Sequence, residues 1–210
     1  MNKLGDLSCN EFLTELASAA PAPGGGGGAA MAGALAAALA SMVANLTIGK
    51  EKFADREPEV KELLKQAEAE RVRLLQLADD DAAVFNSFMS CYKLPKTTDE
   101  EKAARTAAIR AAAKQAATVP LNIARSSFAV LKLADRLVVA GNPGVITDGA
   151  CSGLLARAAL RCAEYNVRIN LGLTKDEAWN AQAAAELKQL LADAEALETR
   201  LLAVTDKALQ

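Results

Sequence analysis

Apolar side chains recur at helical spacing through most of this chain, and no stretch alternates convincingly between apolar and polar residues as a strand would. The segment from Pro58 to Pro95 keeps an apolar face at intervals of three and four residues. The last segment carries an apolar stripe of Leu187, Leu190, Leu191, Ala194, Leu197 and Leu201. This pattern predicts an all-α bundle of about seven helices, formed by a single domain over residues 1–210.

Three capping boxes mark helix starts, each with a Ser or Thr whose side chain and backbone pair with a Glu three residues later. The pairs are Ser8 with Glu11, Thr98 with Glu101, and Thr174 with Glu177. The first pair predicts a short helix from Cys9 to about Ala19, and the third predicts the start of the terminal helix.

Proline and glycine mark the interruptions. Pro120 lacks a backbone donor, so we expect it to kink or break the helix that starts after Thr98. A further helix then ends at Gly141. Thr147 or Asp148 is the expected N-cap of the helix after the following loop.

One long segment, from Gly24 to Gly49, carries no charge and consists mostly of Ala and Gly. It is long enough to span a membrane, but alanine is only weakly apolar, and Ser41, Asn45 and Thr47 interrupt the segment. Small side chains let neighbouring helices approach closely. We therefore expect a buried central helix over Ala29–Thr47, with a surface that could also form an oligomer interface.

The five glycines Gly24–Gly28 stand directly before this helix. Glycine leaves the backbone N–H groups uncovered, and a helix N-terminus has unpaired donors and partial positive charge. The run is therefore a candidate site for an anionic or carbonyl-bearing ligand, with a flexible hinge as the alternative. The Lys-Ser/Thr pair and the preceding strand of a P-loop are missing, which disfavours nucleotide binding.

Composition narrows the class of protein. Hydrophobic residues make up 51% of the chain but aromatic residues only 4%, which suits packed helices better than a sandwich of strands. A formal net charge of −2 provides no basic field, so we expect no nucleic-acid partner. The N-terminus lacks an apolar signal region, and we expect a cytoplasmic protein without a membrane partner.

Cysteine and histidine usage limits the chemistry. The four cysteines form no C-x-x-C pair, which argues against zinc and for reduced thiols, and we expect most of them in the core. The chain contains no histidine, so proton transfer must use Asp, Glu, Lys, Tyr, Cys or water. No metal site is expected.

Asp79, Asp80 and Asp81 are consecutive in the predicted helix, so their side chains point in different directions about 100° apart. Asp81 is the best candidate to face inward, because Phe85 lies four residues later on the same face. The alternative is a solvated acidic patch. Asp148 is a second candidate carboxylate, although capping a helix would also explain it.

Polar side chains elsewhere could bind a ligand. Asn166 and Asn170 carry amides that could pair with the backbone or with a heteroaromatic ring that has its own donors and acceptors. Lys50, Lys52 and Arg56 could hold a carboxylate, although surface solvation is the commoner role of such a cluster.

Five stretches together resemble the cyclodeaminase/cyclohydrolase family, which includes the cyclodeaminase domain of formiminotransferase-cyclodeaminase and stand-alone methenyltetrahydrofolate cyclohydrolases. They are PAPGGGGGAAMAGALAAALASMVANLTIGK at 21–50, DAAVF at 81–85, VPL at 119–121, Gly141-Asn142 with Thr147-Asp148, and NVRIN at 166–170. The resemblance spans nearly the whole chain in order. It implies an all-helical homodimer that binds tetrahydrofolate derivatives.

The resemblance also implies the reaction. The two alternatives are hydrolysis of 5,10-methenyltetrahydrofolate to 10-formyltetrahydrofolate, and cyclisation of 5-formiminotetrahydrofolate to the methenyl form with release of ammonia. No cofactor beyond the tetrahydrofolate substrate is implied, and a separate formiminotransferase could supply the formimino substrate. A non-catalytic folate-binding or helical interaction protein of the same fold is the competing reading.

The resemblance assigns candidate roles to ten residues of this sequence. The catalytic candidates are Asp81 and Asp148. Should Asp81 fail, the proton-transfer group is to be sought at Asp148, Lys50 or Tyr165, a choice that rests on residue type and not on the resemblance. The substrate-binding candidates are Pro23, Gly24, Gly25, Gly26, Lys50, Asn142, Asn166 and Asn170.

Three positions depart from the family pattern. Gly27 stands where the family usually has Ser, Val84 where it has Ala, and Gly144 where it has a second Asn. Loss of a hydroxyl and of an amide alters the polar groups available to a pterin ring.

Overall fold

The structure, a computed structural model, describes residues 3–210 and contains six α-helices and three short 3-10 turns within them, with no strand. The helices are α1 (Cys9–Leu16), α2 (Gly25–Asn45), α3 (Glu57–Cys91), α4 (Asp99–Ala140), α5 (Ile146–Thr174) and α6 (Glu177–Ala208). The all-α expectation is confirmed, and the helix count is close to the expected seven.

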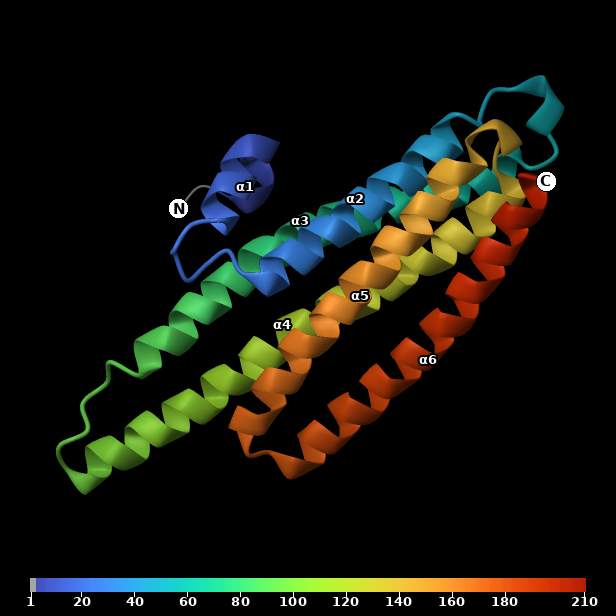
Figure 1. Ribbon diagram of the computed structural model, residues 1–210. Helices are drawn as coiled ribbons and strands as arrows, with labels where there is room; N and C mark the ends of the chain where they lie inside the picture. The colour runs from blue at the N-terminus through green and yellow to red at the C-terminus, as the bar shows by residue number, and fades with distance from the viewer. Residues whose placement is uncertain (1–2) are drawn as a thin grey trace.

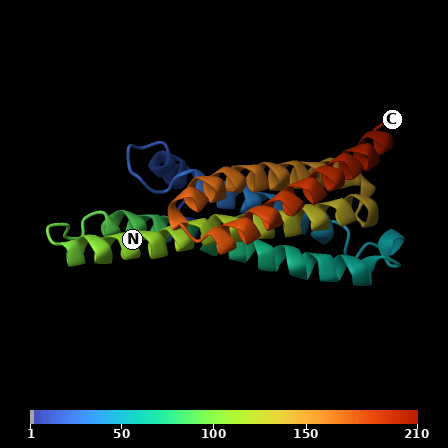
Figure 2. The same ribbon diagram turned by 90° about the horizontal axis from the view of Figure 1, so that it is seen from below.

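Helices α2, α3, α4 and α5 form a bundle in which each packs against the next and α5 closes the ring on α2. Helix α6 packs on α4 and α5, and α1 stands beside the start of α2 (Figure 1). Seen from below, α5 lies toward the top of the bundle and α3 toward the bottom (Figure 2). The α3–α4 hairpin extends past the ends of α2 and α5, so that its inner face is open at the N-terminus of α2 (Figure 1).

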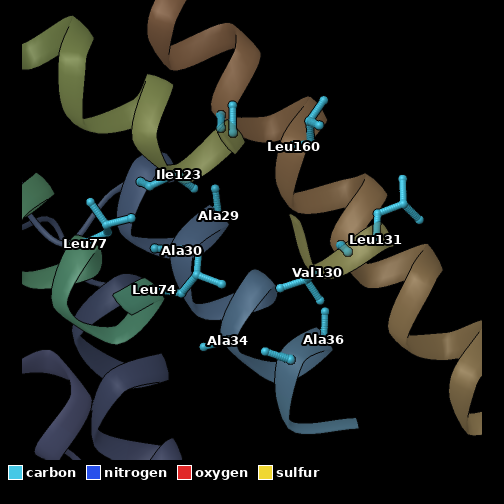
Figure 3. Close-up of a cluster of buried hydrophobic side chains, with 14 of the residues drawn as sticks. Ala29, Ala30, Ala34, Ala36, Leu74, Leu77, Ile123, Val130, Leu131 and Leu160 are labelled. Carbon is cyan, nitrogen blue, oxygen red and sulfur yellow. The ribbon is translucent and has the colours of Figure 1, made fainter. Parts of the chain in front are cut away.

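Helix α2 lies at the centre because its small side chains let three other helices approach. Ala29, Ala30, Ala34 and Ala36 meet the larger side chains of α3, α4 and α5 in one apolar cluster (Figure 3). The larger partners drawn there are Leu74, Leu77, Ile123, Val130, Leu131 and Leu160. This is the arrangement that the run of small residues predicts.

The expected burial of Ala29–Thr47 holds for only part of the helix circumference. Leu35, Met42 and Leu46 are exposed, because α2 has no neighbour on that side in the described chain. By length and composition α2 is also the one helix in residues 3–210 that could cross a membrane, but 61% of its most apolar window is buried against the other helices.

Pro120 lies inside α4 and does not end it, so one continuous helix replaces the two that were expected. The carbonyl that Pro120 leaves without its helical donor belongs to Ala116, and the side chain of Asn170 donates to it at 3.0 Å. This replacement bond satisfies the interrupted turn, which a sequence pattern alone does not reveal.

Two of the three capping boxes are present, at Ser8 and at Thr98. The third prediction is wrong: Asp176 caps α6 by accepting from the Trp179 N–H, while the Thr174 hydroxyl lies within 2.6 Å of Asn180 Oδ1.

Two further local expectations are wrong. The residue at the N-cap of α5 is Val145, without a side-chain cap, and both Thr147 and Asp148 lie inside the first turn. The cysteines also differ from expectation: none is buried, and Cys9, Cys151 and Cys162 are exposed.

The core predicts a stability difference between two neighbouring positions on α3. Leu74 is fully buried in the cluster, so Leu74→Ala should lower the free energy of unfolding by about 2–5 kcal/mol in chemical denaturation. Val72, 58% exposed on the same helix, is the matched control, and Val72→Ala should change stability by no more than about 0.5 kcal/mol. Equal effects of the two changes would contradict the assigned core.

Candidate functional site

A cavity of about 280 Å³ lies where the N-terminus of α2 meets the base of the α3–α4 hairpin and the end of α5. Four segments separated in the sequence contribute to it, so only the fold brings them together. Its lining residues are Pro21, Ala22, Gly24, Gly25, Gly26, Asp81, Phe85, Phe88, Ala116, Asn166 and Asn170.

The glycine run forms the first turn of α2, with Gly24 as its N-cap and no side-chain cap. Gly26 is required here for space: a Cβ at this position would lie 2.6 Å from the carboxyl carbon of Asp81. The start of the helix and the carboxyl group therefore touch directly. The glycines are therefore not a flexible hinge, since Gly25–Gly28 are helical. They allow the backbone of α2 to lie close to Asp81.

The three consecutive aspartates have three different environments. Asp79 accepts a hydrogen bond from the Leu4 N–H at 2.6 Å and holds the N-terminal turn on α3. Asp80 accepts from Gln76 on the exposed face of the helix. Only Asp81 lines the cavity, as its spacing from Phe85 predicts.

Burial raises the pKa of the Asp81 carboxyl above its ordinary value, and a hydrogen bond from the Gly27 backbone N–H partly offsets this rise. The carboxylate thus has a donor at a helix N-terminus but no cationic side chain among the residues that line the cavity with it. Such a group can hold or release a proton closer to neutral pH than a solvated aspartate can.

Asn166 and Asn170 lie one turn apart on α5 and line the cavity next to Gly25. The Asn166 amide nitrogen donates to the Cys162 carbonyl at 2.9 Å. The Asn170 amide nitrogen donates to two carbonyls, those of Ala116 at 3.0 Å and Asn166 at 2.8 Å. Both amides are therefore held by backbone, and both still line the cavity.

Three other predicted site residues, Asp148, Asn142 and Lys50, lie at the opposite end of the bundle. Asp148 and Asn166 are both on α5, separated by about 27 Å at the helical rise. Asn142 fastens the α4–α5 connection to the end of α2, through its side-chain bond to the Leu46 carbonyl and its backbone bond to Thr47. Lys50 follows that same end of α2 and is exposed. Within one subunit, these three residues do not join the cavity.

Two more positions differ from the sequence-based picture. Pro23 is buried beneath the glycine turn, against Gly27, and does not line the cavity. Tyr165, the substitute proton-transfer residue, is 60% exposed on the outer face of α5.

The sequence assigned no site role to four wall residues: Pro21, Ala22, Phe88 and Ala116. Phe88 lies seven residues after Asp81, a spacing that places both on one helix face, so the sequence did carry this signal. Ala116 lies four residues before Pro120, at the carbonyl that a helical proline exposes. Ala22 had no comparable signal.

A larger groove, of about 500 Å³, lies between α3, α4 and α6, and three of its five charged side chains are in ion pairs. Buried Asp135 pairs with Arg200 on α6, and Arg136 pairs with Glu59 on α3. No group of three Asp, Glu or Cys side chains in residues 3–210 is arranged to hold a metal ion. The smaller cavity remains the better candidate because a partly buried carboxylate, two amides and a helix N-terminus converge on it.

An all-helical bundle with a cavity at a glycine-lined helix N-terminus has the kind of concave site that small molecules occupy. Residues 8–189 match the formiminotransferase-cyclodeaminase family. The chain belongs to this family, as the sequence motifs predict.

Individual relatives agree with this assignment. The chain is 45% identical to a methenyltetrahydrofolate cyclohydrolase from Methylorubrum extorquens over 94% of this chain and 95% of that protein. It is 33% identical to the formimidoyltransferase-cyclodeaminase of Sus scrofa over 87% of this chain, but it covers only 34% of that longer protein. A crystal structure of formiminotetrahydrofolate cyclodeaminase from Thermotoga maritima superimposes with a TM-score of 0.88 at 30% identity, covering 98% of each chain.

The contact between Gly26 and Asp81 predicts a steric effect on the site. Gly26→Ala places a methyl group on the carboxyl, so it should displace Asp81 and lower turnover of 5,10-methenyltetrahydrofolate by about 10-fold or more, measured spectrophotometrically. Gly28→Ala is the control, since its Cβ meets only the end of the Leu16 side chain at 3.9 Å. Normal turnover in a folded Gly26→Ala variant would show that the site does not need the close contact between Gly26 and Asp81.

Proposed function

We propose that this protein is a folate one-carbon enzyme that hydrolyses 5,10-methenyltetrahydrofolate to 10-formyltetrahydrofolate. The observation that carries the proposal is the partly buried Asp81 carboxylate facing a glycine-lined helix N-terminus inside a small cavity. Cyclohydrolysis is placed before cyclodeamination because the cyclohydrolase relative matches along nearly its full length at 45% identity, whereas the cyclodeaminase relatives are 30% and 33% identical.

The size of the cavity fits this substrate class. A volume of about 280 Å³ is at the small end for ligand pockets, enough for a bicyclic ring with its one-carbon bridge. Phe85 and Phe88 offer aromatic surface to such a ring, and the rest of a folate molecule would extend out of the cavity.

Asp81 serves this reaction in two ways. Its negative charge stabilises the methenyl cation electrostatically. It then accepts a proton from the water whose oxygen attacks the bridge carbon, and it delivers that proton to N5 as the carbon–N5 bond breaks. The hydroxyl on the bridge carbon loses its remaining proton to solvent as the formyl C=O forms, so one water is consumed and one proton is released. A raised pKa suits a group that must both accept and donate.

The same site could perform cyclodeamination, in which N10 attacks the formimino carbon and ammonia leaves after protonation. For that activity a separate formiminotransferase would be the partner that supplies the substrate. Neither reaction requires a cofactor beyond the tetrahydrofolate substrate, and the proposed location of the enzyme is the cytoplasm. Assays with both substrates decide between the activities, and folate binding without turnover of either would favour a non-catalytic binding protein.

Replacing Asp81 tests its role. Asp81→Asn keeps the size of the side chain and removes its charge and basicity, so turnover should fall by about 100-fold or more while tetrahydrofolate binding persists. Asp80→Asn, on the exposed face of the same turn, is the control and should retain activity. If folded Asp81→Asn keeps near-normal rates on both substrates, another group performs the proton transfer.

The raised pKa of Asp81 gives this variant a second signature. The folded state binds this proton more tightly than the unfolded chain does, so the stability contributed by the carboxyl is present at low pH and is lost as pH rises through its folded pKa. Asp81→Asn should therefore not lower the thermal midpoint at neutral pH. In the wild type, the rate should fall at low pH with a midpoint above the ordinary pKa of aspartate, as Asp81 becomes protonated. Asp81→Asn should remove this fall. A persisting fall would assign it to another group.

We further propose a homodimer that forms through the outer faces of α2 and α5. These helices lie side by side, and both expose apolar side chains that no other helix of the described chain covers. The exposed apolar residues are Leu35, Met42, Leu46, Leu154, Tyr165 and Ile169. A two-fold axis perpendicular to both helices would pair this face with itself.

Such a dimer would also resolve the division of the predicted site residues. Helices α2 and α5 run antiparallel, since Ser152 bonds the Ala36 carbonyl while Asn142 bonds the end of α2. A perpendicular two-fold axis brings the Asp148 end of one copy opposite the Asn166 end of the other. The second copy would then supply Asp148 near the cavity, which makes the expected assisting role of this residue geometrically possible.

A charge introduced on this face tests the dimer. Leu35→Lys should convert a species of twice 21.9 kDa into a monomer in sedimentation, and turnover should fall about as far as in Asp81→Asn. Val72→Lys introduces the same charge at a position of equal exposure, 58%, on α3 and should change neither property. A wild-type monomer would overturn the dimer, and a fully active Leu35→Lys monomer would show that one subunit holds the whole site.

A further inference from the structure

A proline inside a helix exposes one backbone carbonyl, and in this protein that carbonyl controls a side chain of the cavity. Pro120 is fully buried in the middle of α4 and has no N–H to donate to the carbonyl four residues earlier, that of Ala116. The donor comes from another helix: Asn170 Nδ2, on α5, lies 3.0 Å from this oxygen. Ala116 and Asn170 both line the cavity, so this hydrogen bond lies in the cavity wall.

This contact fixes which way the Asn170 amide points. Its NH2 group has two protons, and two backbone carbonyls, of Ala116 and Asn166, accept them. Carbonyl oxygens can only accept, so an amide turned the other way would set oxygen against oxygen at both contacts. The one polar atom of the side chain left over is Oδ1, and it has no donor among residues 3–210.

We propose that Pro120 is a positioning residue: by freeing the Ala116 carbonyl it locks the Asn170 amide so that its oxygen accepts an N–H of the ligand. Asn166 is held in the same sense, since its nitrogen donates to the Cys162 carbonyl and its oxygen is left over. The Oδ1 atoms of both asparagines are thus left as acceptors on the α5 side of the cavity, next to the start of α2.

This polarity selects a class of ligand. A ring bound in the cavity must present N–H donors toward these two oxygens. A reduced pterin has such donors in its ring N–H groups and its exocyclic amine. This step rests on the proposed folate function, whereas the locking of the amide does not.

The first experiment restores the missing donor. Pro120→Ala supplies an N–H that bonds to the Ala116 carbonyl within α4 and competes with Asn170 Nδ2 for this oxygen. Helix content and thermal stability should be unchanged or higher, because alanine suits a helix interior. The dissociation constant for tetrahydrofolate should rise about 3- to 10-fold, the effect of losing one neutral hydrogen bond, with KM for methenyltetrahydrofolate rising more than kcat falls.

A double-mutant cycle tests whether this loss passes through Asn170. Asn170→Ala removes the acceptor and should weaken tetrahydrofolate binding to the same extent, and Pro120→Ala combined with Asn170→Ala should weaken it no further. Pro95→Ala, in the exposed α3–α4 connection, controls for the change of residue type and should bind normally. Wild-type affinity in Pro120→Ala, or additive losses in the double variant, would overturn the proposal.

A measurement without ligand separates this proposal from the proposed function. In the free protein, the Asn170 side-chain amide protons should be protected from solvent exchange by nuclear magnetic resonance, and Pro120→Ala should remove the protection. Unprotected protons in the wild type would refute the locking itself. Protected protons in a protein that neither binds nor converts folates would refute only the proposed function.

Discussion

The fold depends on the close approach that the missing side chains of α2 permit. At Gly33, a Cβ would lie 3.0 Å from Leu74 and 3.1 Å from Ser127, so α3 and α4 both contact the helix where it has no side chain. On the α5 side, the Ser152 hydroxyl reaches the Ala36 carbonyl at 2.7 Å, which is possible only between backbones that lie close together. A larger residue at these positions would force the bundle apart. The closeness that builds the core also brings Asp81 against the first turn of α2.

The electrostatics of the cavity follow from that contact. Burial disfavours the charged carboxylate, whereas a helix N-terminus and the Gly27 N–H favour it, and for Asp81 the first effect is the larger. The chain has no histidine, so a carboxyl with a raised pKa is the candidate group for proton exchange in this cavity. The glycine run is therefore needed twice, for the space that admits the carboxyl and for the bare donor that faces it.

Much of this arrangement could be predicted from local patterns. The capping boxes at Ser8 and Thr98, the small-residue helix and the inward direction of Asp81 each depend on residues a few positions apart, where helical geometry determines the outcome. The family motifs likewise identified Gly24–Gly26, Asn166 and Asn170, which the fold brings together. The same motifs also assigned Asn142 and Asp148 to the site, but within one chain these two residues lie far from the cavity. They stand near the start of α5, and the length of this helix separates them from Asn166 and Asn170 near its end.

Pro120 shows why a wrong prediction from the sequence, the break of α4, falls next to the candidate site. By local rules a proline at this position ends a helix, and the sequence accordingly predicted two helices where there is one. The helix continues because a side chain from α5 replaces the lost donor, and this is a long-range contact that local rules do not contain. Natural sequences break such rules mainly where function compensates for the lost stability. Here the compensation is specific: the hydrogen bond that α4 lacks is the one that orients an amide at the cavity, so a local defect in one helix becomes a recognition element on another.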